Sequence, residues 1–196
     1  MTQPSTPAGT APGTAPHPDL WKPVLLRSAA ALVFGAVTVF WTSPSVEVMG
    51  WAGGLYLLAV GVLLLRTIPA AGLGQKSVPG KLLSAAGATL AGAGFALLLL
   101  HSDLLFGVIA ALGLGVAGVI ELACGLRQRS RHVLARDWIA SGIIGLGTAV
   151  LLPFFINLGA HALLGVAGGG AIVSGVLWVL SGLTLRHDAR TGAGKP

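Results

Sequence analysis

The sequence predicts an all-α integral membrane protein with six transmembrane helices, arranged as three parallel two-helix hairpin repeats with a period of 57 residues. Hydrophobic residues make up 54% of the 196 residues, charged residues make up 9%, and the mean hydropathy is +0.85. Soluble domains are about one-quarter charged, so this composition indicates a membrane protein. A Gly-Val pair recurs every 57 residues, at Gly61-Val62, Gly118-Val119 and Gly175-Val176. Recurrence at a fixed spacing indicates an internal repeat.

The first hairpin is expected at about residues 24–65. Residues 1–20 hold five prolines and almost no large apolar side chain, so we expect them to form a disordered cytoplasmic tail. The apolar run that follows Lys22 is long enough to cross a hydrocarbon core, which takes about 20 helical residues. Pro44 breaks this helix because proline lacks a backbone donor, and a second apolar run follows directly. The short connection predicts an antiparallel pair.

The second and third hairpins are expected at about residues 82–126 and 138–185. Residues 66–81 are rich in proline, glycine and charge and are typical of a loop, and residues 127–137 form a basic loop. The membrane domain therefore covers residues 21–186, and residues 187–196 form a second cytoplasmic tail. The predicted helices cover about residues 24–42, 48–65, 82–100, 104–126, 138–153 and 162–185.

The lysine and arginine residues predict the orientation of the chain. All 12 fall on one side of the predicted helices, at the termini or in the loops between hairpins. By the positive-inside rule the protein is a multi-pass protein of the cell (cytoplasmic) membrane with both termini cytoplasmic. Each hairpin then begins inside, so the repeats run in the same direction, and packing around a pseudo-threefold axis is the simplest arrangement. Small residues at four-residue spacing, such as Gly50 and Gly54, predict close contacts between helices.

Glu121 is the only carboxylate inside an apolar span. An intramembrane ionisable residue is by default a functional hypothesis, here a proton or cation site. The alternative is a structural role, because Glu121 lies near the cytoplasmic end of its helix and could reach the interface or pair with Arg27 or a basic loop. The structural role is the favoured interpretation.

The predicted outer turns contain four further ionisable side chains: Glu47, His101, Asp103 and His161. Histidines and carboxylates change charge as the pH falls from about 7 to about 4, so these residues are candidates for sensing external pH. Glu47 and His161 also occupy equivalent positions in the 57-residue repeat. Turns need polar residues in any case, and the His-x-x-His type of spacing that favours a metal is missing, so no metal is predicted.

Several other classes of function are excluded by the sequence pattern. Gly113, Gly115 and Gly118 satisfy GxGxxG, but they lie inside an apolar span rather than between a strand and a helix, so no dinucleotide cofactor is expected. GxSxG is missing, and we predict neither an enzyme nor any other cofactor. A single cysteine, Cys124, excludes an intramolecular disulfide. Anionic lipids, rather than a nucleic acid, are the expected partners of the basic loop, and a homo-oligomer is compatible with the pattern.

The arrangement of glycines and turns resembles the HdeD-type family of small bacterial membrane proteins. The likeness covers residues 22–186 and rests on the three hairpins, the apolar run from Arg27 to Gly35, the turn at Pro44 and the repeated Gly-Val pairs. This family is associated with acid resistance. The resemblance implies a non-enzymatic protein of the bacterial inner membrane that supports tolerance of acid or envelope stress, and it implies no catalytic or ligand residues. The alternative function is a small transporter or channel for protons or a small solute, with Glu121 as its polar site.

Overall fold

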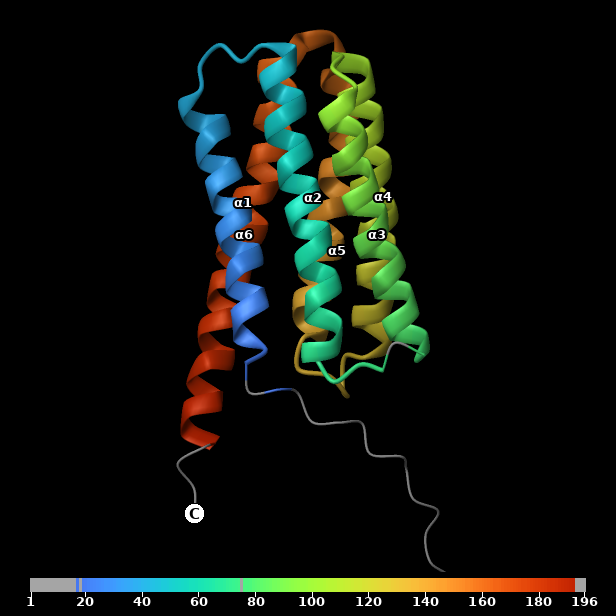
Figure 1. Ribbon diagram of the computed structural model, residues 1–196, viewed down its shortest axis with the longest axis vertical. Coiled ribbons are helices and arrows are strands. Elements are labelled where there is room, and N and C mark those ends of the chain that lie inside the picture. Colours follow the sequence, from blue (N-terminus) through green and yellow to red (C-terminus); the bar gives the residue numbers. More distant parts are fainter. Residues whose placement is uncertain (1–16, 18, 75, 193–196) are drawn as a thin grey trace, which may run out of the picture.

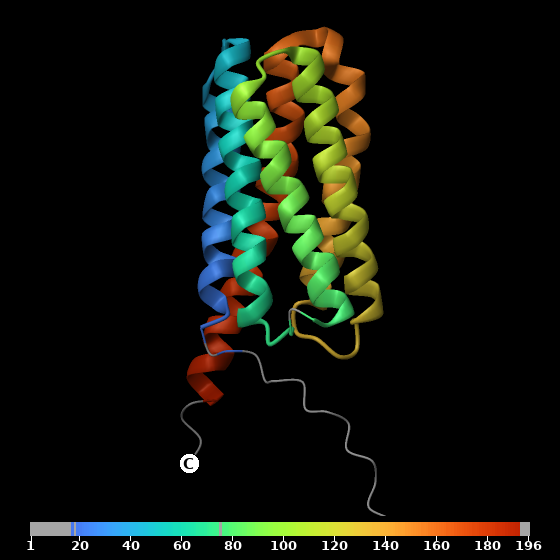
Figure 2. The same ribbon diagram turned by 45° about the vertical axis from the view of Figure 1, so that its right-hand side comes forward.

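The computed structural model describes residues 17, 19–74 and 76–192, and these residues form an all-α bundle (Figure 1). Successive helices run in opposite directions and lie side by side, as Figure 2 shows from a second angle. In chain order the elements are α1 (Trp21–Phe40), α2 (Val46–Ala70), α3 (Val78–Leu99), α4 (Asp103–Arg127), α5 (Ala135–Leu151), the 3-10 segment η1 (Leu152–Leu158) and α6 (Gly159–Gly192).

Five helical stretches of the described chain are long and apolar enough to cross a membrane. The first four are α1 to α4, and the fifth runs over 57 residues from Ala135 to Thr191. A continuous helix of that length would measure about 85 Å, against about 30 Å for a hydrocarbon core. The chain turns back at η1, so α5 and α6 lie antiparallel within this stretch (Figure 2). The chain is therefore a multi-pass membrane protein.

The reversal at η1 has a local cause in two residues. Pro153 stands near the start of η1 and cannot continue the helical hydrogen bonding of α5, because it has no backbone N–H. Gly159 then adopts a φ of +81°, a left-handed conformation that costs glycine little. Together they end one helix and let α6 begin in the opposite direction.

Three helices begin at a serine that caps the first turn. The hydroxyl of Ser45 accepts a hydrogen bond from the Val48 backbone N–H, and those of Ser77 and Ser102 do the same for residues three positions further on. Serine is among the best N-cap residues because its side chain satisfies an otherwise unpaired N–H. These caps place the starts of α2, α3 and α4.

The helices extend further than the apolar runs predicted. Residues 66–81 were predicted as a loop, but α2 continues through Arg66 to Ala70 and α3 begins at Val78. The predicted tail from residue 187 is also helical as far as Gly192. A charged residue ends an apolar run without ending a helix, because a long side chain can extend to the polar interface. The predicted disordered tail of residues 1–20 lies largely outside the described residues.

The most extensive helix packing joins α2 to α3, α4 to α5 and α6 to α1. The two helices within each predicted hairpin also pack together, but less extensively. A Cβ atom added at Gly61 would lie 2.6 Å from backbone atoms of Gly87 and Ala91 on α3. One added at Gly118 would lie 3.1 Å from backbone atoms of α5, and one at Gly175 would lie 2.8 Å from a side chain of α1. Each Gly-Val glycine therefore stands where a neighbouring helix approaches its backbone.

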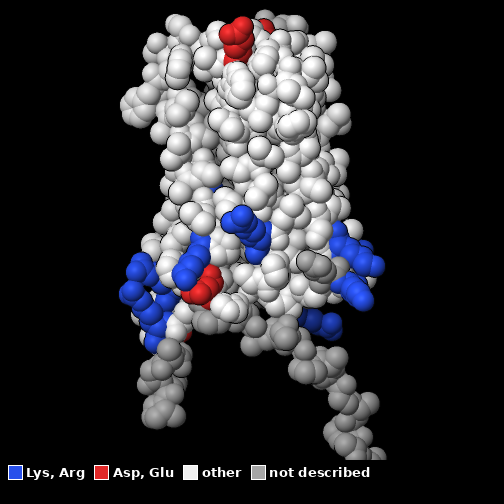
Figure 3. Space-filling view, viewed as in Figure 1, with Lys and Arg blue, Asp and Glu red and all other residues white. Residues whose placement is uncertain are grey.

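Charge is distributed unequally between the two ends of the bundle (Figure 3). We call the end where α1 begins and α6 ends the basic end. The lysine and arginine side chains gather there together with acidic side chains, whereas the charged side chains visible at the opposite end are acidic (Figure 3). The helix termini and connections at the basic end carry Lys22, Arg66, Lys76, Lys81, Arg127, Arg129, Arg131, Arg136, Arg186 and Arg190.

We predict that Gly61→Ala lowers the free energy of unfolding by about 1–3 kcal/mol, because its methyl group would overlap backbone atoms of α3 and force the helices apart. Gly92→Ala is the matched control, since a Cβ there would meet nothing within 4 Å. Thermal unfolding of both variants in detergent measures the difference. Equal stability of the two would contradict the role assigned to Gly61.

Candidate functional site

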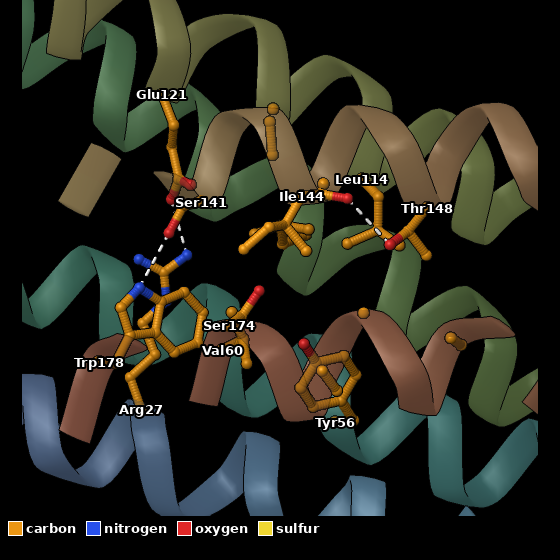
Figure 4. Close-up of a pocket in the computed structure, with 17 residues that line it drawn as sticks. Arg27, Tyr56, Val60, Leu114, Glu121, Ser141, Ile144, Thr148, Ser174 and Trp178 are labelled. Carbon is orange, nitrogen blue, oxygen red and sulfur yellow. Dashed lines mark hydrogen bonds and ion pairs between the residues drawn. The ribbon is translucent and has the colours of Figure 1, made fainter. Parts of the chain in front are cut away.

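A buried ion pair between Arg27 and Glu121 lies in the interior of the bundle (Figure 4). Arg27 Nη2 donates a hydrogen bond to Glu121 Oε1 at 2.7 Å, although the two residues are 94 positions apart. Arg27 is 7% exposed and Glu121 is 3% exposed. Pairing of Glu121 with Arg27 was one of the structural alternatives that the sequence left open, and this pairing is confirmed.

Trp178 holds the guanidinium from a second side. The Arg27 Cζ atom lies 4.0 Å from the centroid of the Trp178 ring, which is the geometry of a cation–π contact. The indole Nε1 in turn donates a hydrogen bond to Ser141 Oγ at 2.9 Å (Figure 4). Side chains from α1, α4, α5 and α6 thus meet around one positive charge.

The ion pair connects two helices that are not neighbours in the bundle. In the described part of the chain the backbones of α1 and α4 do not lie side by side, so the side chains of Arg27 and Glu121 reach across the interior to each other. Arg27 Nε also has no hydrogen-bond partner among the described residues. Burying an unpaired charge is costly, so the Glu121 carboxylate lowers the free-energy cost of burying the Arg27 guanidinium.

A small cavity of about 30 Å³ adjoins the ion pair, and all six α-helices contribute to its wall. A buried water needs about 10–15 Å³, so one or two waters fit, whereas pockets for organic ligands measure about 300–1,000 Å³. The cavity can hold water or a proton but not a metabolite. Its polar lining consists of Arg27, Tyr56, Glu121, Ser141, Thr148 and Ser174 (Figure 4).

Two residues of this core were missed from the sequence. Tyr56 on α2 borders the cavity and stacks on Phe34, with ring centroids 4.4 Å apart. Asp137 lies in the first turn of α5, accepts a hydrogen bond from Ser181 and borders a second cavity together with Arg27. The sequence interpretation assigned Asp137 to the basic loop. If the fifth helix had been predicted to begin about one turn earlier, as α5 does, Asp137 would have been placed inside a helix rather than in a loop.

The ionisable residues of the opposite end do not form a site together. Glu47, His101 and His161 are exposed, whereas Asp103 is half-buried in the first turn of α4. Within the described ranges no ion pair joins Glu47 to His161, and no group of three His, Cys, Asp or Glu residues could hold a metal ion. His101 instead stacks on Trp51, with ring centroids 6.1 Å apart. A role of these residues in sensing pH stays a prediction.

Comparison of the chain with protein-family models, with curated proteins and with solved structures gave no match.

We predict that removing either partner of the ion pair destabilises the bundle more than removing both. Arg27→Met or Glu121→Leu should each cost about 3–5 kcal/mol, because one buried charge is left unpaired, whereas the double variant should lie close to wild type. Unfolding in detergent, with the exposed Glu47→Gln as control, measures all four proteins. A double variant as unstable as the sum of the single variants would contradict the pairing.

Proposed function

We propose that this chain is a non-enzymatic protein of the bacterial inner membrane, of the HdeD type, that supports tolerance of acid or envelope stress. The observation that supports this proposal is the interior of the helix bundle. The buried Arg27–Glu121 ion pair balances one positive charge with one negative charge, and the cavity beside it is large enough for water alone. Such an interior is suited to keeping a bundle closed within the membrane, and it offers no room for a substrate of metabolite size.

We further propose that the six helices all cross the membrane, as three parallel hairpins with both termini cytoplasmic. The supporting observations are the reversal at η1 and the packing of α2 on α3, α4 on α5 and α6 on α1, which closes a ring. Leu64, Glu121 and Trp178 stand 57 residues apart and are all buried, at 1%, 3% and 5% exposure. Equivalent positions of a repeat around a common axis would face inward in this way.

A second function, conduction of protons or a small cation, is favoured by one specific observation. The polar cavity contains an ionisable pair and hydroxyl groups in a bundle whose interior is mostly apolar. Polar and ionisable groups inside membrane proteins commonly mark ion or proton pathways. In this second proposal Glu121 is the group that exchanges a proton.

The orientation is tested by cysteine labelling in intact cells. We expect a membrane-impermeant thiol reagent to modify Ser43→Cys in the α1–α2 turn and to leave Ser130→Cys in the basic loop unmodified, because the positive-inside rule places that loop in the cytoplasm. Both serines are exposed, and the buried Cys124 makes wild type the blank. Labelling of Ser130→Cys before cell lysis would contradict the orientation.

The stress function is tested by survival of a deletion strain in acid. Wild type should restore survival, and Glu47→Gln and His161→Ala should restore it less, because they remove the ionisable groups that face the outside in the proposed orientation. Asp188→Asn, an exposed change at the basic end, is the control at matched expression. A deletion strain that survives acid and envelope-damaging agents as well as its parent would refute the function.

The conduction function is tested by proton flux into proteoliposomes. Wild type should dissipate an imposed pH gradient faster than empty liposomes, and Glu121→Gln should reduce this rate by at least tenfold if the carboxylate exchanges the proton. Glu47→Gln serves as the control outside the cavity. Equal rates for wild type and empty liposomes would exclude this second function and leave the first in place.

A further inference from the structure

We propose that Asp137 is a proton-binding site that opens toward the basic end of the bundle and shares the Arg27 guanidinium with Glu121. The site deepens the second function proposed above, because it would supply the entry point of a proton pathway. Proton binding is nevertheless a separate property from flux and can be measured without it.

Asp137 borders two spaces at once. On one side it lines a surface groove between α5 and α6 together with Ser181 and Asp188. On the other side it lines a cavity of about 20 Å³ together with Arg27 and Trp178. Because α5 begins and α6 ends at the basic end, the groove lies at that end of the bundle. A proton that enters the groove therefore meets Asp137 before it meets the buried arginine.

The spaces continue inward from Arg27. Arg27 and Trp178 line the small cavity next to Asp137 and also the central cavity next to Glu121, so the two cavities meet at these side chains. The ionisable groups are thus ordered from the surface inward as Asp137, Arg27 and Glu121. Hydroxyl groups of Ser141 and Ser174 line the central cavity beyond them.

The charge balance of this cluster calls for one more proton. Arginine keeps its proton in proteins, so one positive charge is paired with Glu121 and also lines the same small cavity as Asp137. With both carboxylates ionised, the three side chains would carry a net charge of −1, which is costly where Arg27 and Glu121 are buried and Asp137 is half-buried. Transfer of one proton from a hydronium ion in the groove breaks an O–H bond of that ion, forms the O–H bond of a neutral carboxyl group and leaves a water molecule, and the three side chains together become neutral.

The hydrogen bonds indicate which carboxylate takes that proton. Glu121 accepts a charge-assisted bond from Arg27 at 2.7 Å, which stabilises its negative charge. Asp137 accepts its bond from the neutral hydroxyl of Ser181. Among the described residues Arg27 Nε is buried without a hydrogen-bond partner, so its N–H can donate to a water or to Asp137. Asp137 is therefore the group that binds the proton while Glu121 stays paired.

Few other ionisable groups adjoin the cluster in the described chain. Tyr56 of α2 borders the central cavity on the side of the ion pair away from Asp137, and α3 contributes only an aliphatic side chain there. Arg136 and Asp188 line the surface groove, where they are exposed. His132 is occupied by a contact with the Ala71 carbonyl oxygen and by stacking on Trp138.

Infrared difference spectroscopy tests the proposal on the purified full chain in lipid nanodiscs. Spectra recorded as the pH is lowered from about 8 to about 4 should show the C=O stretch of a buried carboxylic acid, because protonation converts a carboxylate into this group. We expect Asp137→Asn to abolish the band and Asp188→Asn to leave it unchanged. Glu121→Gln should keep the band but shift its appearance to lower pH, since Arg27 then has Asp137 as its only counter-ion.

Two results would overturn the site. In the first, the band is lost in Glu121→Gln but is still present in Asp137→Asn, which would place the proton on Glu121. The other is the lack of any buried-acid band in wild type. If Asp137→Asn does not fold, Ser181→Ala is the second test. This variant removes the hydrogen bond to Asp137 and should therefore shift the frequency of the band. An unshifted band would refute the assignment to Asp137. If the band behaves as expected but the proteoliposomes show no proton flux, the conduction function is refuted and the proton-binding site at Asp137 is retained.

Discussion

The structure depends on neutralising one positive charge in an apolar bundle. Arg27 is buried in α1, and Glu121 from α4 neutralises it while the face of Trp178 from α6 covers it. Ser141 on α5 then fixes the indole. Because each of these groups is costly to bury alone, their mutual contacts specify how the helices are placed around the interior. The ion pair is consequently both a structural constraint and the chemical centre of the molecule.

Such a core requires helices that approach closely, and the glycines make this approach possible. In lipid there is little hydrophobic drive between helices, so association depends on packing and on polar contacts. Gly61, Gly118 and Gly175 each admit a neighbouring helix at a distance that a larger residue would prevent. In the described part of the chain, the two cavities that Arg27 lines are of water size, about 30 and 20 Å³.

Much of this fold follows from apolar runs, glycine spacing and the placement of lysine and arginine. The sequence offered Arg27 as one of several possible partners of Glu121, and the packing of the helices decides between them. Helix ends were predicted less well, since Arg66 interrupts the apolar pattern but not the hydrogen bonding of α2. Asp137 was missed because a carboxylate next to basic residues looks like part of a loop, and only the packing of α5 on α6 shows that it faces Ser181. The roles of Glu47, Asp103 and His161 stay predictions.

The central claim is that Arg27 and Glu121 are in contact inside the membrane-embedded bundle. Solid-state NMR of the protein in lipid bilayers can measure the dipolar coupling between guanidinium nitrogens and glutamate carboxylate carbons. Arg27 Nη2 lies 2.7 Å from Glu121 Oε1, and the carboxylate carbon is one bond further, so we expect a measurable coupling in wild type. The coupling should disappear both in Arg27→Lys, which removes the guanidinium, and in Glu121→Gln, which removes the labelled carboxylate. Weak coupling in wild type, or coupling that persists in both variants, would contradict the account.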